Sequence, residues 1–144
     1  MAIRIPTAKI QNLQQIEALV AGPDGANRLF ILTGQFDTEF FATSNGDFVQ
    51  KHEIFTVLIG PVFTRQQFFK AISSASVIKS SNNVLTVAGG HQSKWEILNV
   101  DADWDDESGQ VEIRIEVAVS VYGNHNIAQI YGLSFHTTIL AALP

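Results

Sequence analysis

The chain has 144 residues, a usual length for one domain, so residues 1–144 are expected to form a single domain around one hydrophobic core. Fourteen acidic and nine basic residues give a formal charge of −5, and the basic residues stand singly, which argues against nucleic acid as a partner. Cysteine is absent, which excludes disulfides, thiolate nucleophiles and cysteine-based metal sites.

Charged residues are scarce in this composition. Asp, Glu, Lys and Arg make up 16% of the chain, whereas about 25% is usual for soluble proteins. A chain this short of charge is expected to cover part of its surface with further subunits, so a homo-oligomer is predicted. The alternative is a monomer whose surface consists of the plentiful Ser, Thr, Asn and Gln residues.

The N-terminus is not typical of an export signal. Residues 1–22 mix Gln, Lys and Glu with apolar residues and hold no continuous hydrophobic stretch. No apolar run in the chain approaches the length of a membrane span. We therefore expect a cytoplasmic protein, or one that resides in an assembled particle, without a membrane partner.

The first expected elements are a short extended segment, residues 2–4, and a helix. Pro6 and Thr7 form a helix-entry signal, and apolar residues then recur at three- and four-residue spacing. This pattern predicts a helix over residues 8–21. Gly22-Pro23 would end it, because Gly accepts the left-handed conformation and Pro cannot continue a helix.

The next stretch predicts a strand and a hairpin. Residues 28–34 hold a compact apolar run that is typical of a buried strand. Asn45-Gly46 lies between aromatic-rich segments and is a strong hairpin signal, because both residues accept a positive φ.

A second helix is expected over residues 64–76. Thr64 and Gln67 have the spacing of a capping box, and Phe68 and Ile72 contribute to an apolar stripe at helical spacing. This helix is predicted to lie on the sheet.

Strand patterns dominate about the last 60 residues. Apolar and polar residues alternate from Val111 to Val121, which sets the period at two. The predicted strands are Val84–Val87, Trp95–Trp104, Gln110–Tyr122 and Ile127–Leu140. Two helices packed on an antiparallel sheet of long C-terminal strands give α+β as the predicted fold class.

The last predicted strand has apolar residues on both faces under strict alternation. Leu133 and Phe135 fall on one face, and Ala128 and Ile130 fall on the other. A strand that is apolar on both faces is covered on both. The second cover is expected from the second helix or from a neighbouring subunit.

One acidic segment has part of the pattern of a calcium-binding loop. Its carboxylates stand at loop positions 1, 3, 5 and 12, and hard oxygen ligands at this spacing suit Ca²⁺: Asp101, Asp103, Asp105 and Glu112. Position 6, which requires Gly, is Asp106, and the flanks have strand patterns rather than helical ones. The favoured interpretation is a solvated hairpin tip without a cofactor, and a Ca²⁺ site is the alternative.

Ser134, His136 and Thr138 form a polar row on the last predicted strand. The favoured interpretation is a hydrogen-bonded row at a subunit contact. The alternative is a pocket between the sheet and the second helix for an unidentified small molecule, lined by His91, Trp95, Ser134 and His136.

The aromatic residues are mainly of the kind that fills cores. Ten Phe stand against two Tyr and two Trp, whereas ligand-binding surfaces favour Tyr and Trp. Phe40, Phe41 and Phe48 lie near the predicted hairpin tip, where little of the chain can cover them. They are predicted to contact a neighbouring subunit, together with Ile130 of the last strand.

No motif specifies a reaction. A Gly-x-Ser-x-Gly nucleophile elbow is absent, and the scattered carboxylates have no diagnostic spacing. The sequence therefore favours a non-catalytic, self-associating subunit of a repeating assembly, for instance a phage-like particle. The alternative is a small ligand-binding or enzymatic α+β domain.

Overall fold

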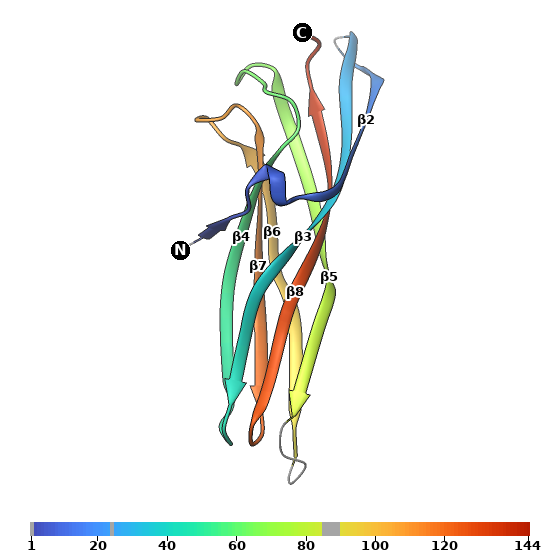
Figure 1. Ribbon diagram of the computed structural model, residues 1–144. Coiled ribbons are helices and arrows are strands. Elements are labelled where there is room, and N and C mark those ends of the chain that lie inside the picture. The colour runs from blue at the N-terminus through green and yellow to red at the C-terminus, as the bar shows by residue number, and fades with distance from the viewer. Residues whose placement is uncertain (1, 24, 85–89) are drawn as a thin grey trace.

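The computed structural model describes residues 2–23, 25–84 and 90–144. Over these residues the chain forms eight strands, and its only helical element is one 3-10 turn. The strands make two four-stranded sheets that pack face to face in an elongated molecule (Figure 1). The predicted α+β fold class is therefore wrong, because the protein is almost entirely β.

The elements follow one another along the chain with few long connections. They are β1 (Ala2–Arg4), η1 (Thr7–Lys9), β2 (Gln11–Gly22), β3 (Gly25–Ser44), β4 (Val49–Ile59), β5 (Phe68–Val84), β6 (Gln92–Trp104), β7 (Val111–Tyr122) and β8 (Asn126–Ala141). One sheet has the order β1-β4-β7-β6 and the other has the order β2-β3-β8-β5. Neighbouring strands are antiparallel except β1, which is parallel to β4.

The helix predicted over residues 8–21 is a single turn followed by β2. The entry signal does produce a turn, since Lys9 N donates to Pro6 O at 2.9 Å and Ile10 N donates to Thr7 O at 3.1 Å. The chain then extends, and residues 14–22 pair with β3. The ladder with β3 satisfies the backbone groups that a helix would satisfy internally, so tertiary pairing overrides a weak helical preference.

The helix predicted over residues 64–76 is likewise replaced by a strand. The capping box itself forms: Thr64 N donates to Gln67 Oε1 at 2.9 Å, and Gln67 N donates to Thr64 Oγ1 at 3.3 Å. The turn ends there and β5 begins at Phe68. From Ala71 to Ser80, half-buried and exposed residues alternate with a period of two, as expected for a strand that pairs with β8.

The Asn45-Gly46 segment forms a turn, with Gly46 at a φ of 114°, but it does not form a two-stranded hairpin. β3 pairs with β8 and β4 pairs with β7, so this turn carries the chain from one sheet to the other. The segment from β7 to β8 makes a similar crossing. The hairpins within one sheet are β2–β3 and β6–β7 in the described part of the chain.

The three long strands predicted near the C-terminus correspond to β6, β7 and β8, with β7 beginning one residue later than predicted. The short strand predicted at Val84–Val87 is different. Val84 is the last residue of β5, and residues 85–87 lie outside the described residues.

β8 does not have two apolar faces, contrary to the sequence-based interpretation. Relative to β5, Tyr131 is an extra residue, because Lys79 pairs with Gly132 and Ser80 pairs with Ile130. This β-bulge shifts the alternation by one residue, so Ile130 and Leu133 both face the core. The opposite face of β8 is half-buried or exposed at most positions, and polar Ser134, His136 and Thr138 occupy much of it.

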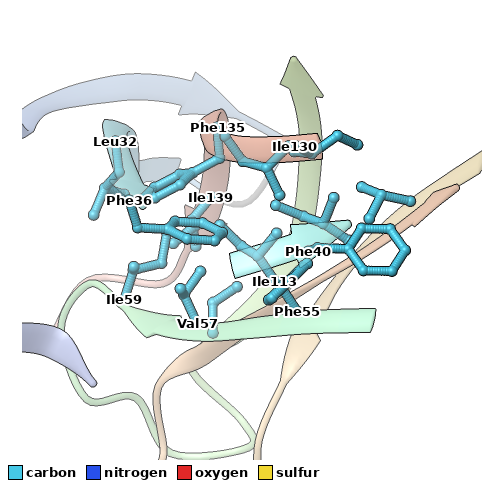
Figure 2. Close-up of a cluster of buried hydrophobic side chains, with 14 of the residues drawn as sticks. Leu32, Phe36, Phe40, Phe55, Val57, Ile59, Ile113, Ile130, Phe135 and Ile139 are labelled. Atoms are coloured by element: carbon cyan, nitrogen blue, oxygen red, sulfur yellow. The ribbon is translucent and has the colours of Figure 1, made fainter. Parts of the chain in front are cut away.

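The core lies between the two sheets. Figure 2 shows Phe36, Phe40 and Phe135 of one sheet directed toward Phe55 and Val57 of the other. The Phe36 and Phe55 ring centroids are 6.1 Å apart, and those of Phe40 and Phe55 are 6.5 Å apart in an edge-to-face arrangement. Apolar residues at alternate positions of β7, from Val111 to Val121, are fully buried. The period of two that the sequence shows in this strand is confirmed.

Asn126 ties together four strands where β7 passes into β8. Its side chain is fully buried, and its amide nitrogen donates to Tyr122 O at 2.9 Å, Gln92 O at 3.2 Å and Ser93 Oγ at 3.4 Å. Its amide oxygen accepts a hydrogen bond from Asn82. This one amide therefore connects the adjoining ends of β5, β6, β7 and β8.

Candidate functional site

The solvent-facing side of the sheet β2-β3-β8-β5 carries most of the predicted polar row. Directly paired residues lie on the same face, so register defines rows of side chains across the four strands. In strand order these rows are Ala18, Leu29, Leu140 and Lys70; Ile16, Ile31, Thr138 and Ile72; and Gln14, Thr33, His136 and Ser74. Two partly apolar rows therefore lie beside a polar one.

An open depression of about 400 Å³ lies on this face. Ser134 and His136, which the sequence places on one side of a strand, both line it. The other polar side chains around it come from three further strands: Asn12, Gln14, Thr33, Gln35, Ser74 and Ser76. Hydroxyl, amide and imidazole groups converge here, which suits hydrogen bonding to a neutral polar partner.

His91 and Trp95 do not join this depression. Trp95 is on β6, packs against the core, and donates from its indole nitrogen to Gln129 O at 3.0 Å. The His91 ring lies beside Asn124 O at 3.1 Å, near the turn at Gly123. The predicted pocket needs a helix as one of its walls, and that helix does not form, because residues 68–76 belong to β5.

The four residues predicted to contact a neighbour divide into two pairs. Phe40 and Ile130 are buried in the core. Phe41 and Phe48 are exposed, at 51% and 64% of their surfaces, and the Lys51 ammonium lies 5.7 Å from the Phe41 ring centroid. Phe41 and Phe48 therefore remain available to a partner.

The acidic residues around the β6–β7 hairpin take separate partners. Asp101 accepts from Asn99 at 3.0 Å, and Asp103 accepts from Trp104 N at 2.7 Å. Glu112 pairs with Arg4. Asp105 accepts from Ser108 N at 3.0 Å and Ser108 Oγ at 2.6 Å, and these bonds hold the pKa of the Asp105 carboxyl below its usual value.

A metal at these carboxylates stays a prediction. In residues 2–23, 25–84 and 90–144, no group of three or more His, Asp or Glu side chains is placed to hold a metal ion.

One ion pair crosses β8 below the depression. Lys79 Nζ on β5 lies 2.8 Å from Asp37 Oδ1 on β3, and Gly132 stands between them in register. A Cβ at Gly132 would lie 2.9 Å from Lys79 Cγ. Glycine at this position therefore leaves room for the Lys79 side chain to cross β8. The hydrogen bond from Lys79, assisted by one from Gln11, lowers the pKa of Asp37.

Replacing Lys79 with glutamine should raise the pKa of Asp37 toward the usual 3.8, as measured by NMR titration of the carboxyl carbon. Because the pKa is depressed in the folded state, the pair's contribution to stability is present above pH 3.8 and is lost as the pH falls. Lys70→Gln, on the same strand, is the control and should leave the Asp37 titration unchanged. An unchanged titration in Lys79→Gln would contradict this ion pair.

β2 is the part of this face that sequence reasoning missed. Ile16 was expected on a helix, yet it lies on this face of an edge strand with 63% of its surface exposed, and Leu19 on the opposite face of the same strand is 68% exposed. Thr33, Ser74 and Ser76 were also missed, since they approach Ser134 and His136 only through strand pairing. The alternation of Ser with apolar residues over residues 74–77 was the one available signal for β5.

Comparison with known proteins gives no functional assignment. In the part of the chain that the structure describes, no helix is long and apolar enough to cross a membrane. The chain matches no protein-family model, no curated protein sequence and no solved structure.

Proposed function

We propose that this protein is a non-catalytic, self-associating structural subunit of a homo-oligomeric assembly, for instance a phage-like particle. The observation that carries the proposal is the exposure of large apolar side chains on a chain with few charges. Within the described residues, fourteen large apolar or aromatic side chains are exposed, among them Ile16, Leu19 and Ile72. Charged residues make up only 16% of the sequence, so little charge offsets this exposed apolar surface.

Two of the exposed apolar residues belong to a partly apolar patch on one sheet. Ile16 and Ile72 are in the same cross-strand row, with Ile31 and Thr138 between them, and the half-buried Leu29 and Leu140 are in the adjacent row. Apolar groups that adjoin one another mark contact surfaces more strongly than single exposed residues do. The predicted cytoplasmic location, or location within a particle, accompanies this proposal.

Native mass spectrometry at micromolar concentration tests this function. We expect species whose masses are whole multiples of 15.8 kDa, and we expect their fraction to fall on dilution. Light scattering in the same buffer gives an independent mass. A uniform monomer of 15.8 kDa in both measurements would overturn the proposal.

Binding of a small polar molecule is the second candidate function. The open depression around Ser134 and His136 favours it, because polar groups from four strands meet there. A ligand at this place would raise Tm in the unmodified protein but not in His136→Ala. A ligand whose effect survives that substitution would argue against this site.

A further inference from the structure

β2 is bound to the rest of the protein along one edge only. It pairs with β3 from Gln11 to Gly22, and among the described residues it has no strand on its other side. Ile16 points to the outer face, in the row of Ile31, and Leu19 points to the opposite face, in the row of Arg28. Both are more than half exposed, so this ribbon presents apolar groups on two faces in addition to its unpaired backbone edge.

The other sheet edges in the described chain carry features that discourage strand addition. β1 has only three residues and pairs with residues 54–56 of β4, and the part of β4 before them, which β1 leaves unpaired, carries Lys51 and Glu53. β5 holds two lysines and has register shifts at three places. β6 holds four charged residues, and it lies against β5 where the two sheets meet.

β2 lacks these protections. Glu17 is its one charged residue, it contains no proline, and its pairing is regular from Gln14 to Gly22. A long, regular and nearly uncharged edge strand is a template for another strand. The edges of this protein therefore differ in a way that directs association to β2.

We propose that β2 pairs antiparallel with β2 of a second copy about a two-fold axis, which joins the two sheets into one continuous eight-stranded sheet. This inference rests on the proposed self-association and names its contact. A two-fold axis uses the same strand from both copies, the commonest arrangement in homo-oligomers. Main-chain hydrogen bonds then satisfy both free edges at once.

Charge complementarity identifies a second copy as the partner and sets the register. With the axis at Ala18, Glu17 of each copy lies opposite Leu19 of the other. Leu19 is opposite Arg28 on β3, so each Glu17 enters the same cross-strand row as Arg28 of the second copy, with about 10 Å between their Cα atoms. Arg28 Nε donates to Ala142 O, so the two opposite charges attract across this distance without a direct contact. An axis at Glu17 would instead oppose the two carboxylates, which is unfavourable.

A single cysteine tests this pairing, because the chain contains no other. At the axis, the two Ala18 Cα atoms would be about 4.5 to 5.5 Å apart, within the range of a disulfide. Mild oxidation of Ala18→Cys should therefore convert most of the protein to a covalent dimer on a non-reducing gel. Ser76→Cys, an exposed position on β5 of the same sheet, is the control and should remain largely uncrosslinked.

A charged variant provides the second measurement. Ile16→Lys combined with Leu19→Lys should convert the oligomer to monomer in native mass spectrometry while the circular dichroism spectrum stays unchanged, because both positions are exposed. Leu98→Lys, exposed on β6 of the other sheet, should leave the oligomer intact.

The outcomes separate this inference from the proposed function. An unmodified protein that is oligomeric, resists the double lysine change and forms no disulfide at position 18 would overturn the β2 pairing and leave self-association in place. A monomeric unmodified protein would overturn both.

Discussion

Replacing Phe36 with alanine should lower the free energy of unfolding by about 3 to 5 kcal/mol. The Phe36 ring is fully buried between the sheets, with the rings of Phe55 and Phe135 at centroid distances of 6.1 and 6.4 Å (Figure 2). Removing it leaves a cavity that neighbouring strands cannot close, because both sheets are held by continuous hydrogen-bond ladders. Urea denaturation followed by circular dichroism measures the change.

Phe48→Ala is the matched control, since the same group is removed from a ring that is 64% exposed. Its effect should stay within about 0.5 kcal/mol at equal protein concentration. Equal losses for Phe36→Ala and Phe48→Ala would contradict the placement of the core.

Replacing Asn126 with aspartate should also lower the free energy of unfolding near pH 7, by about 3 to 5 kcal/mol. The substitution keeps the shape of the side chain but removes the donor that bonds Tyr122 O and Gln92 O, and it sets a carboxylate against those oxygens. The side chain is fully buried, so water cannot compensate.

The loss of unfolding free energy in Asn126→Asp should be smaller at acidic pH. Burial raises the pKa of the new carboxyl above its unfolded value, so the folded variant binds a proton more tightly than the unfolded chain does. Stability relative to the unmodified protein therefore rises as the pH falls through the raised pKa toward about 4. Asn124→Asp, in the exposed turn nearby, should show little effect at either pH. A pH-independent loss at position 126 would count against a buried charge as its cause.

The strand patterns were predictable where one face of a strand is wholly buried. β7 alternates because its Val and Ile residues at every second position from Val111 to Val121 all enter the core, and Ala118 is the one aliphatic residue on its other face. The same reasoning failed at β8, since one extra residue at Tyr131 reverses the alternation and strict counting cannot reveal a bulge.

The two helix errors have a common origin. Pro6-Thr7 and Thr64–Gln67 are real local signals, and each produces a turn with the expected hydrogen bonds. Such signals specify how an element starts but not how it continues. The residues after each turn extend into strands because they pair with other parts of the chain. β2 pairs with β3, and β5 pairs with β8.

The candidate site was only partly foreseeable. Ser134 and His136 share a face because they are two residues apart, so that pairing follows from the sequence. Thr33 and Ser74 join His136 only because β3 and β5 flank β8, and no local pattern encodes which strands become neighbours. The free edge of β2 was missed for the same reason.

The position of β8 has a consequence for biosynthesis. Among the eight strands β8 is synthesised last, yet it lies between β3 and β5, and Arg28 finds its partner Ala141 only after the other seven strands have been made (Figure 1). Until then β3 and β5 lack the strand that separates them. Chains in such an incomplete state are prone to pair their strands wrongly. Folding that depends on such distant encounters takes milliseconds to seconds once the chain is released, so shielding by a chaperone during that interval should increase the yield of native protein.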